Sequence, residues 1–143
     1  MVSAPAVAKE RNIEITEAIS ETLDEFQTLI RLTVTTEKQV RSVEGTLSHG
    51  NRPRVVRIKD ISIDAELGPN MLYIKNEDKP GFVGNLGTTL GDAGINIATF
   101  NLGRHKTLGD SIALIETDGS VPDEIAEKVR KLPHVVKVIP LKF

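Results

Sequence analysis

Residues 71–100 combine two kinds of hydrophobic spacing, which together predict a strand, a helix and a second strand. Residues 71–76 read MLYIKN. Successive side chains would alternate between two faces, which is the two-residue period of an extended segment. From Phe82 to Ala93 the apolar residues recur largely at spacings of three and four, the period of one helical face. Ile95 then opens a second extended stretch.

Chemical signals mark each boundary of this stretch. Asp78 lies just before the predicted helix, where its carboxylate is expected to accept a hydrogen bond from the unpaired amides of the first turn. Pro80 is expected within that turn, where its missing N–H costs nothing. Gly94 suits a left-handed residue after the helix.

The remaining C-terminal residues continue the alternation of strands and helices. Strands are predicted over residues 96–103, 110–117 and 134–140, with a polar hairpin loop over 104–109. A helix follows the SVPD sequence at 120–123 and ends before Pro133, with acidic residues early and basic residues late, as the helix dipole favours. The order βαββαβ predicts a ferredoxin-like sandwich, with two helices on one face of an antiparallel sheet.

The N-terminal half predicts a different architecture. A short helix is expected over residues 4–11 with Ser3 as its cap, and the acidic stretch 16–24 is expected to be a loop or a marginal helix. Strands predicted over residues 26–35, 38–47, 54–59 and 61–65 follow one another with short turns and therefore form an antiparallel meander. Residues 67–70, LGPN, are the predicted linker between the two halves. The short helix is too small to cover this sheet.

Composition narrows the functional classes. The 143 residues are 39% apolar and carry a formal charge of −2, which suits one ordinary domain or two small ones and gives no bulk attraction to nucleic acid or anionic membranes. The chain has no cysteine, no long apolar run and no signal-like start, so a disulfide framework, a thiol nucleophile and a membrane partner are not expected. Cytoplasm is the expected location.

The usual signs of catalysis are weak. The histidines His49, His105 and His134 have no helical spacing to a carboxylate or to one another, so no metal site is predicted. The glycine-containing run GNLGTTLG at 84–91 lies inside the predicted helix, where its glycines are expected to permit close helix packing. No catalytic residue and no cofactor are predicted for these residues.

The stronger chemical prediction is a small polar cup at the start of the helix after residue 80. Asn76, Asp78, Asn96 and the amides of residues 81–83 are expected near one helix N-terminus. Bare amides suit a carboxylate and Asp78 suits an ammonium group, so the cup matches a free amino acid.

The NEDKPGF and GINIATFNLGR segments resemble the first βαβ unit of ACT domains, which are amino-acid-sensing modules of metabolic enzymes. With SAPAVAKER, TVTT, EGTL and the closing LPHVVKVIPLKF, practically the whole chain resembles the C-terminal regulatory region of long bacterial D-3-phosphoglycerate dehydrogenases. The resemblance implies an α+β chain in two parts. Residues 1–67 would be a truncated antiparallel-sheet domain, the intervening or allosteric substrate-binding domain, and residues 68–143 a ferredoxin-like ACT domain. The sheet of the first part would find cover in a partner copy or stay partly exposed.

The resemblance also implies a ligand and a partner. In this family the corresponding turn and asparagine bind L-serine at the seam between two ACT domains whose sheets join side by side. Carried over, the effector site comprises Asn76, Asp78, Pro80, Gly81, Phe82, Val83 and Asn96, with Asn76 and Asp78 facing Asn96 of the next chain in a homo-oligomer. The sequence departs from the family at position 76, where serine-inhibited members often have a larger, ring-bearing residue. The NAD site and the catalytic residues would belong to other domains.

Further interpretations remain beside this one. A second candidate site contains Arg54 and Arg57. Basic residues bind an anion in the intervening domain of some members, and Arg54 resembles one of them by position, although Glu66 replaces a second basic partner. A solvated sheet edge explains the same residues. The C-terminal domain could also be a structural oligomerisation module without an effector. An RNA-binding role would need paired aromatic residues on central strands and a basic face, which Tyr73 and Phe100 do not provide.

Overall fold

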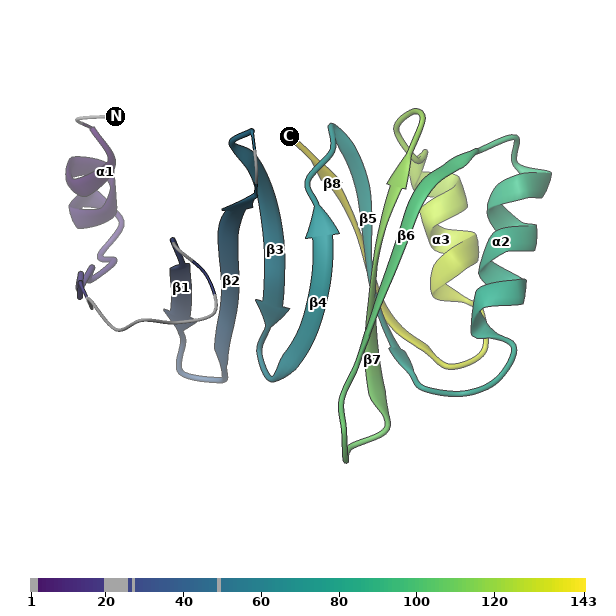
Figure 1. The fold of residues 1–143 in the computed structure, drawn as a ribbon, viewed down its shortest axis with the longest axis horizontal. Coiled ribbons are helices and arrows are strands. Elements are labelled where there is room, and N and C mark those ends of the chain that lie inside the picture. The colour runs from purple at the N-terminus through teal and green to yellow at the C-terminus, as the bar shows by residue number, and fades with distance from the viewer. Residues whose placement is uncertain (1–2, 20–25, 27, 49) are drawn as a thin grey trace.

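The computed structural model describes residues 3–19, 26, 28–48 and 50–143. Over these residues the chain forms two four-stranded antiparallel sheets, and two helices cover the outer face of the second sheet (Figure 1). The elements are α1 (Ala4–Glu10), β1 (Ile30–Thr35), β2 (Val40–Ser48), β3 (Arg52–Ile58), β4 (Ile61–Glu66), β5 (Asn70–Glu77), α2 (Phe82–Asp92), β6 (Ile97–Arg104), β7 (Asp110–Thr117), α3 (Asp123–Arg130) and β8 (Val135–Lys142). No helix among these residues has the length and apolar content needed to cross a bilayer.

The second sheet has the strand order β6-β7-β5-β8, and every pair in it is antiparallel. This confirms the predicted βαββαβ order and ferredoxin-like arrangement. The helix-facing side of β5 and β7 presents Leu72, Ile74, Ala113 and Ile115, which pack against α2 and α3 in one buried cluster. The two-residue period seen in the sequence therefore becomes one apolar face under the helices.

The first sheet is the predicted meander, with order β1-β2-β3-β4. Its first strand is shorter than predicted, because β1 begins at Ile30 and not at residue 26. Residues 13–19 form no strand or helix, and most of the remaining predicted loop lies outside the described residues. Helix α1 occupies the predicted segment and starts after Ser3, but the Ser3 side chain makes no capping hydrogen bond.

The cover of the first sheet differs from the sequence-based expectation. Val55, Ile61, Ile63 and Ala65 of β3 and β4 pack against the open face of the second sheet of the same chain, where they meet Met71, Ile112 and Leu114. No partner copy is needed for this part of the sheet. The apolar side chains of β1 stay largely exposed, at 70% for Ile30, 61% for Leu32 and 51% for Val34, which agrees with the expectation of partial exposure.

The two sheets come closest where β4 crosses β6. A Cβ atom added at Gly103 would lie 2.5 Å from the carbonyl oxygen of Ser62 and 2.7 Å from Cγ2 of Ile61. Gly103 is itself buried, so only a residue without a side chain permits this approach.

The predicted start of α2 needs correction, and the predicted signal at its end is confirmed. Helix α2 begins at Phe82 with Gly81 at its N-cap, so Pro80 lies before the helix and Asp78 does not cap it. Gly94 has φ +72° directly after the C-cap residue, as expected. The glycines Gly84, Gly87 and Gly91 lie inside α2, but added Cβ atoms there would meet nothing within 4 Å, so they do not serve close helix packing.

Gly103→Ala is expected to lower the free energy of unfolding by about 1–3 kcal/mol, because the new methyl group overpacks the crossing of β4 and β6. The control, Gly84→Ala, places a methyl group in open space within a helix and should raise it by about 0.5–1 kcal/mol. Urea denaturation of both variants measures this, and a neutral Gly103→Ala result would contradict the close packing of the two sheets.

Tyr73 should report the inter-sheet packing through its titration, since it is the only tyrosine in a chain without tryptophan. Burial raises the pKa of the Tyr73 hydroxyl, with Lys75 and Arg41 opposing the shift. Because the pKa is higher in the folded chain than in the unfolded chain, the folded state should lose stability as the pH rises above about 10. Absorbance at 295 nm should titrate at higher pH in buffer than in denaturant, and Tyr73→Phe should remove this contribution to the alkaline stability loss.

Candidate functional site

Polar side chains replace the apolar pattern at one end of the second sheet. On the helix-facing side, Arg104, Ser111 and Asn76 lie opposite one another on the neighbouring strands β6, β7 and β5. We call these three residues the polar rung. The adjacent positions in the same register are Leu102, Ala113 and Ile74, which are apolar and belong to or pack against the helix-side cluster.

Asn76 is the member of the polar rung that has an unmet hydrogen-bonding group. Its side chain is 1% exposed, and its Nδ2 atom donates to the carbonyl oxygen of Glu77 at 2.9 Å. Its Oδ1 atom is buried and has no hydrogen-bond partner among the described residues. Ser111 donates only a long hydrogen bond, 3.5 Å, to the backbone carbonyl of Asn76. An unmet buried acceptor costs stability, which is typical of a position kept for something other than packing.

Helix α2 starts beside this rung without a capping side chain. Gly81 adopts φ +93° at the N-cap, and the first turn contains no acidic residue. Phe82 packs its ring into the core, whereas the side chain of Val83 is 51% exposed. The first turn of α2 therefore offers backbone amides, and not side chains, to a negatively charged group.

Asp78 pairs with Arg104 across this helix start. Arg104 Nε lies 3.4 Å from Asp78 Oδ1, and the backbone N–H of Asp78 donates to Gly109 O at 2.7 Å. Sequence reasoning did not select Arg104, which it placed in a polar loop. The signal that could have found it is the register of β6 against β7, which puts position 104 on the helix-facing side, two residues beyond Leu102.

Asn96 does not join this group within one chain. It precedes β6 at the opposite end of α2 and donates from Nδ2 to Asp118 Oδ2 at 2.7 Å. The expectation that all cup residues of one chain gather at one helix N-terminus is therefore wrong for Asn96. Only the Asn96 of another copy could lie near Asp78 and Arg104.

Several other titratable side chains near this end of the second sheet have local partners. Lys75 pairs with Asp110 at 2.9 Å, and His134 Nδ1 lies 3.0 Å from Glu77 Oε2. His105 Nδ1 accepts the backbone N–H groups of Thr107 and Leu108, so this ring orders the loop between β6 and β7. His49 lies outside the described residues, and within them no group of three or more possible ligands is arranged to hold a metal ion.

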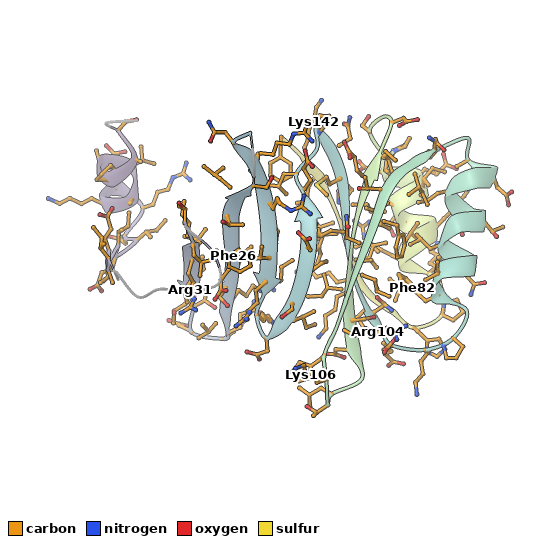
Figure 2. All side chains as sticks on the ribbon, in the orientation of Figure 1. Phe26, Arg31, Phe82, Arg104, Lys106 and Lys142 are labelled. Carbon is orange, nitrogen blue, oxygen red and sulfur yellow. The ribbon has the colours of Figure 1, made fainter. Side chains whose placement is uncertain are left out.

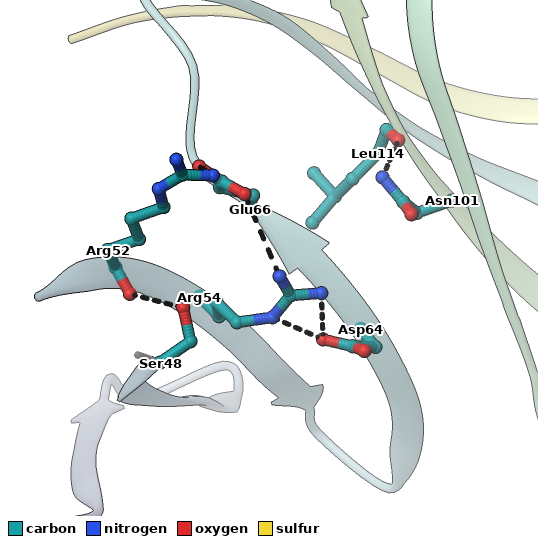
Figure 3. A network of polar contacts seen from close by, with 7 residues as sticks. All are labelled: Ser48, Arg52, Arg54, Asp64, Glu66, Asn101 and Leu114. Carbon is teal, nitrogen blue, oxygen red and sulfur yellow. Dashed lines mark hydrogen bonds and ion pairs between the residues drawn. The ribbon is translucent and has the colours of Figure 1, made fainter. Parts of the chain in front are cut away.

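A hollow of about 1020 Å³ lies elsewhere, beside the first sheet, and Arg54 and Arg57 line it. Arg54 Nη2 lies 2.6 Å from Asp64 Oδ1 and its Nη1 lies 3.7 Å from Glu66 Oε2 (Figure 3). Arg57 Nε lies 3.7 Å from Glu44 Oε2. Both guanidinium groups already face carboxylates, so this arrangement gives no support to the anion site.

The glycine-containing run 84–91 does not fit a dinucleotide. Its glycines lie within α2, whereas a phosphate-binding glycine loop precedes its helix. This run therefore gives no support to a dinucleotide site.

Comparison with protein families gives two matches in the order of the two sheets. Residues 1–59 match the D-3-phosphoglycerate dehydrogenase intervening domain, and residues 70–134 match the ACT domain. The chain joins a D-3-phosphoglycerate dehydrogenase intervening domain to an ACT domain.

Individual relatives agree with both matches. The chain is 33% identical over 138 residues to D-3-phosphoglycerate dehydrogenase of Methanocaldococcus jannaschii, covering 96% of this chain and 26% of the relative. It is 33% identical over 137 residues to the Bacillus subtilis enzyme, covering 96% and 26%. The Mycobacterium tuberculosis enzyme is 33% identical over 128 residues, covering 87% and 24%. The chain thus spans about a quarter of the length of these relatives, and is homologous to that part of them.

Asn76→Val should raise the free energy of unfolding by about 1 kcal/mol, because it replaces an unmet buried acceptor with a good strand-forming residue. Ser111→Ala, a buried neighbour with one long hydrogen bond, is the control and should change stability less. Thermal and urea unfolding of the ligand-free chain measure both. A marked loss of stability in Asn76→Val would mean that the Asn76 amide contributes to folding.

Proposed function

We propose that this chain is the regulatory region of a D-3-phosphoglycerate dehydrogenase and binds L-serine where two ACT domains meet. The proposal includes the division into an intervening domain over residues 1–67 and an ACT domain over 68–143, together with a cytoplasmic location. The observation that carries it is the uncapped start of α2 beside Asp78 and the polar rung.

The chemistry of this end of the sheet suits a small zwitterion. The amides at the start of α2 attract a carboxylate, and the carboxylate of Asp78 attracts an ammonium group. Asn76 adds an acceptor without a partner, which a small movement could offer to the hydroxyl group of serine. A ligand of serine's size fits these requirements because the donors and the carboxylate lie on adjacent short segments.

Strand β6 is the element through which a second copy of the chain would pair. It lies at the edge of the second sheet and pairs only with β7 within that sheet. If β6 of two copies paired antiparallel about a two-fold axis, the start of one strand would face the end of the other. Asn96, just before β6, would then approach Arg104 and Asp78 of the other copy. Because Asn96 Nδ2 already binds Asp118, its Oδ1 atom would be the group offered to the ligand.

In a full-length D-3-phosphoglycerate dehydrogenase, this binding would regulate catalysis in other domains. We propose that serine favours one arrangement of two ACT domains, and that the intervening domain passes this preference to catalytic domains that oxidise 3-phosphoglycerate with NAD. The packing of β3 and β4 on the ACT sheet supports such coupling, because a shift of one sheet must move the other.

Calorimetry of the 143-residue chain with L-serine tests the shared site. Asp78→Ala and Asn96→Ala should each weaken binding about tenfold or more, because each removes a polar partner of the charged ligand. Thr88→Ala, on an exposed part of α2, should bind as the parent chain does.

Mixed dimers of the two variants distinguish a shared site from one within a single chain. A dimer of one Asp78→Ala chain and one Asn96→Ala chain should regain one site of parental affinity, because the intact Asp78 and the intact Asn96 then face each other. No recovery would contradict the shared site. A stable dimer in sedimentation that gives no heat with any amino acid would instead favour the oligomerisation module.

A further inference from the structure

We propose that Asp78 and Arg104 together form the recognition element for the two charges of an α-amino acid, and that Arg104 binds its carboxylate. This inference rests on the proposed effector site and adds a specificity-determining residue to it. Arg104 would be the reason that the site requires a carboxylate as well as an ammonium group.

The position of Arg104 is the first support. It ends β6 on the helix-facing side, in the same register position as Ser111, and Ser111 in turn lies opposite Asn76. Figure 2 shows Arg104 and Phe82, the first residue of α2, at the same end of the molecule. A carboxylate drawn to the amides of this helix start would therefore lie next to the guanidinium group.

The unused bonding capacity of Arg104 is the second support. Among the described residues Arg104 has one ion pair, from Nε to Asp78 Oδ1 at 3.4 Å, and no hydrogen bond from its side chain. The side chain is 67% exposed. Since a guanidinium group carries five N–H donors in a planar fork, Arg104 can keep Asp78 at Nε while its Nη atoms donate to a second carboxylate.

The arrangement of the two opposite charges of Asp78 and Arg104 determines which ligands the pair accepts. An α-amino acid has its ammonium and carboxylate groups one carbon apart, so it can lie antiparallel to the Asp78–Arg104 pair, with each charge facing the opposite one. An amine without a carboxylate would bring its positive charge beside Arg104, and an acid without an ammonium group would bring its negative charge beside Asp78. Such like-charge contacts disfavour the wrong ligand, so the pair selects zwitterions.

Calorimetry with three ligands tests this in the 143-residue chain. L-serine has both charges, ethanolamine lacks the carboxylate, and 3-hydroxypropanoate lacks the ammonium group. The parent chain should bind L-serine most tightly. Arg104→Gln should weaken L-serine binding about tenfold to a hundredfold, because it removes a charge-assisted contact, and should leave ethanolamine binding unchanged or stronger. Arg104→Lys, which keeps the charge without the fork, should lie between Arg104→Gln and the parent.

Lys106→Gln is the matched control, since it removes a positive charge from the exposed loop two residues beyond β6 and should bind L-serine as the parent does. Unfolding midpoints should stay within error for Arg104→Gln, because an exposed ion pair contributes little to stability. Equal L-serine affinity in Arg104→Gln and the parent, or equal losses in Arg104→Gln and Lys106→Gln, would overturn the role of Arg104 while the effector site stands. A parent chain that binds no amino acid would remove the effector site, and this inference with it.

Discussion

The fold depends on burying the two central strands of the second sheet on both faces. On β5 and β7 the helix-facing residues Ile74 and Ile115 pack beneath α2 and α3, while Met71 and Leu114 pack against β3 and β4 of the first sheet. Each half of the chain therefore needs the other: the first sheet gains a cover and the second sheet loses an exposed apolar face. Because apolar burial is the main favourable term in folding, the two sheets are expected to act as one mechanical unit in any regulatory movement.

The candidate site arises where this burial ends. Two residues beyond the last apolar residues of the helix face, the strands present Asn76, Ser111 and Arg104, and helix α2, which begins there, has no capping side chain. The unmet acceptor on Asn76 lowers the stability of the fold, and the exposed ion pair of Arg104 adds little to it. Their concentration at one helix start supports the proposed site for a ligand with two opposite charges.

The local sequence predicted part of the fold correctly and gave wrong predictions at particular residues. The boundaries of β7 and the left-handed Gly94 follow from periodicity and from backbone sterics, which act within a few residues. Asp78 fits a helix cap by sequence, yet it pairs with Arg104, which is 26 positions away in the chain and next to it in space. The glycines of α2 suggested close packing but face open space, because sequence spacing does not reveal what lies opposite a helix face.

The sequence by itself determined the elements and their order, the cup residues contributed by one turn and the family resemblance, since all of these are written in neighbouring residues. Tertiary structure alone decided that the first sheet is covered by its own chain, that Gly103 permits the crossing of β4 and β6, and that Arg104 lies beside Asp78. The physical reason is register: which side chains meet across strands depends on hydrogen-bonded pairing between distant segments, and a shift of one residue would send each side chain to the other face.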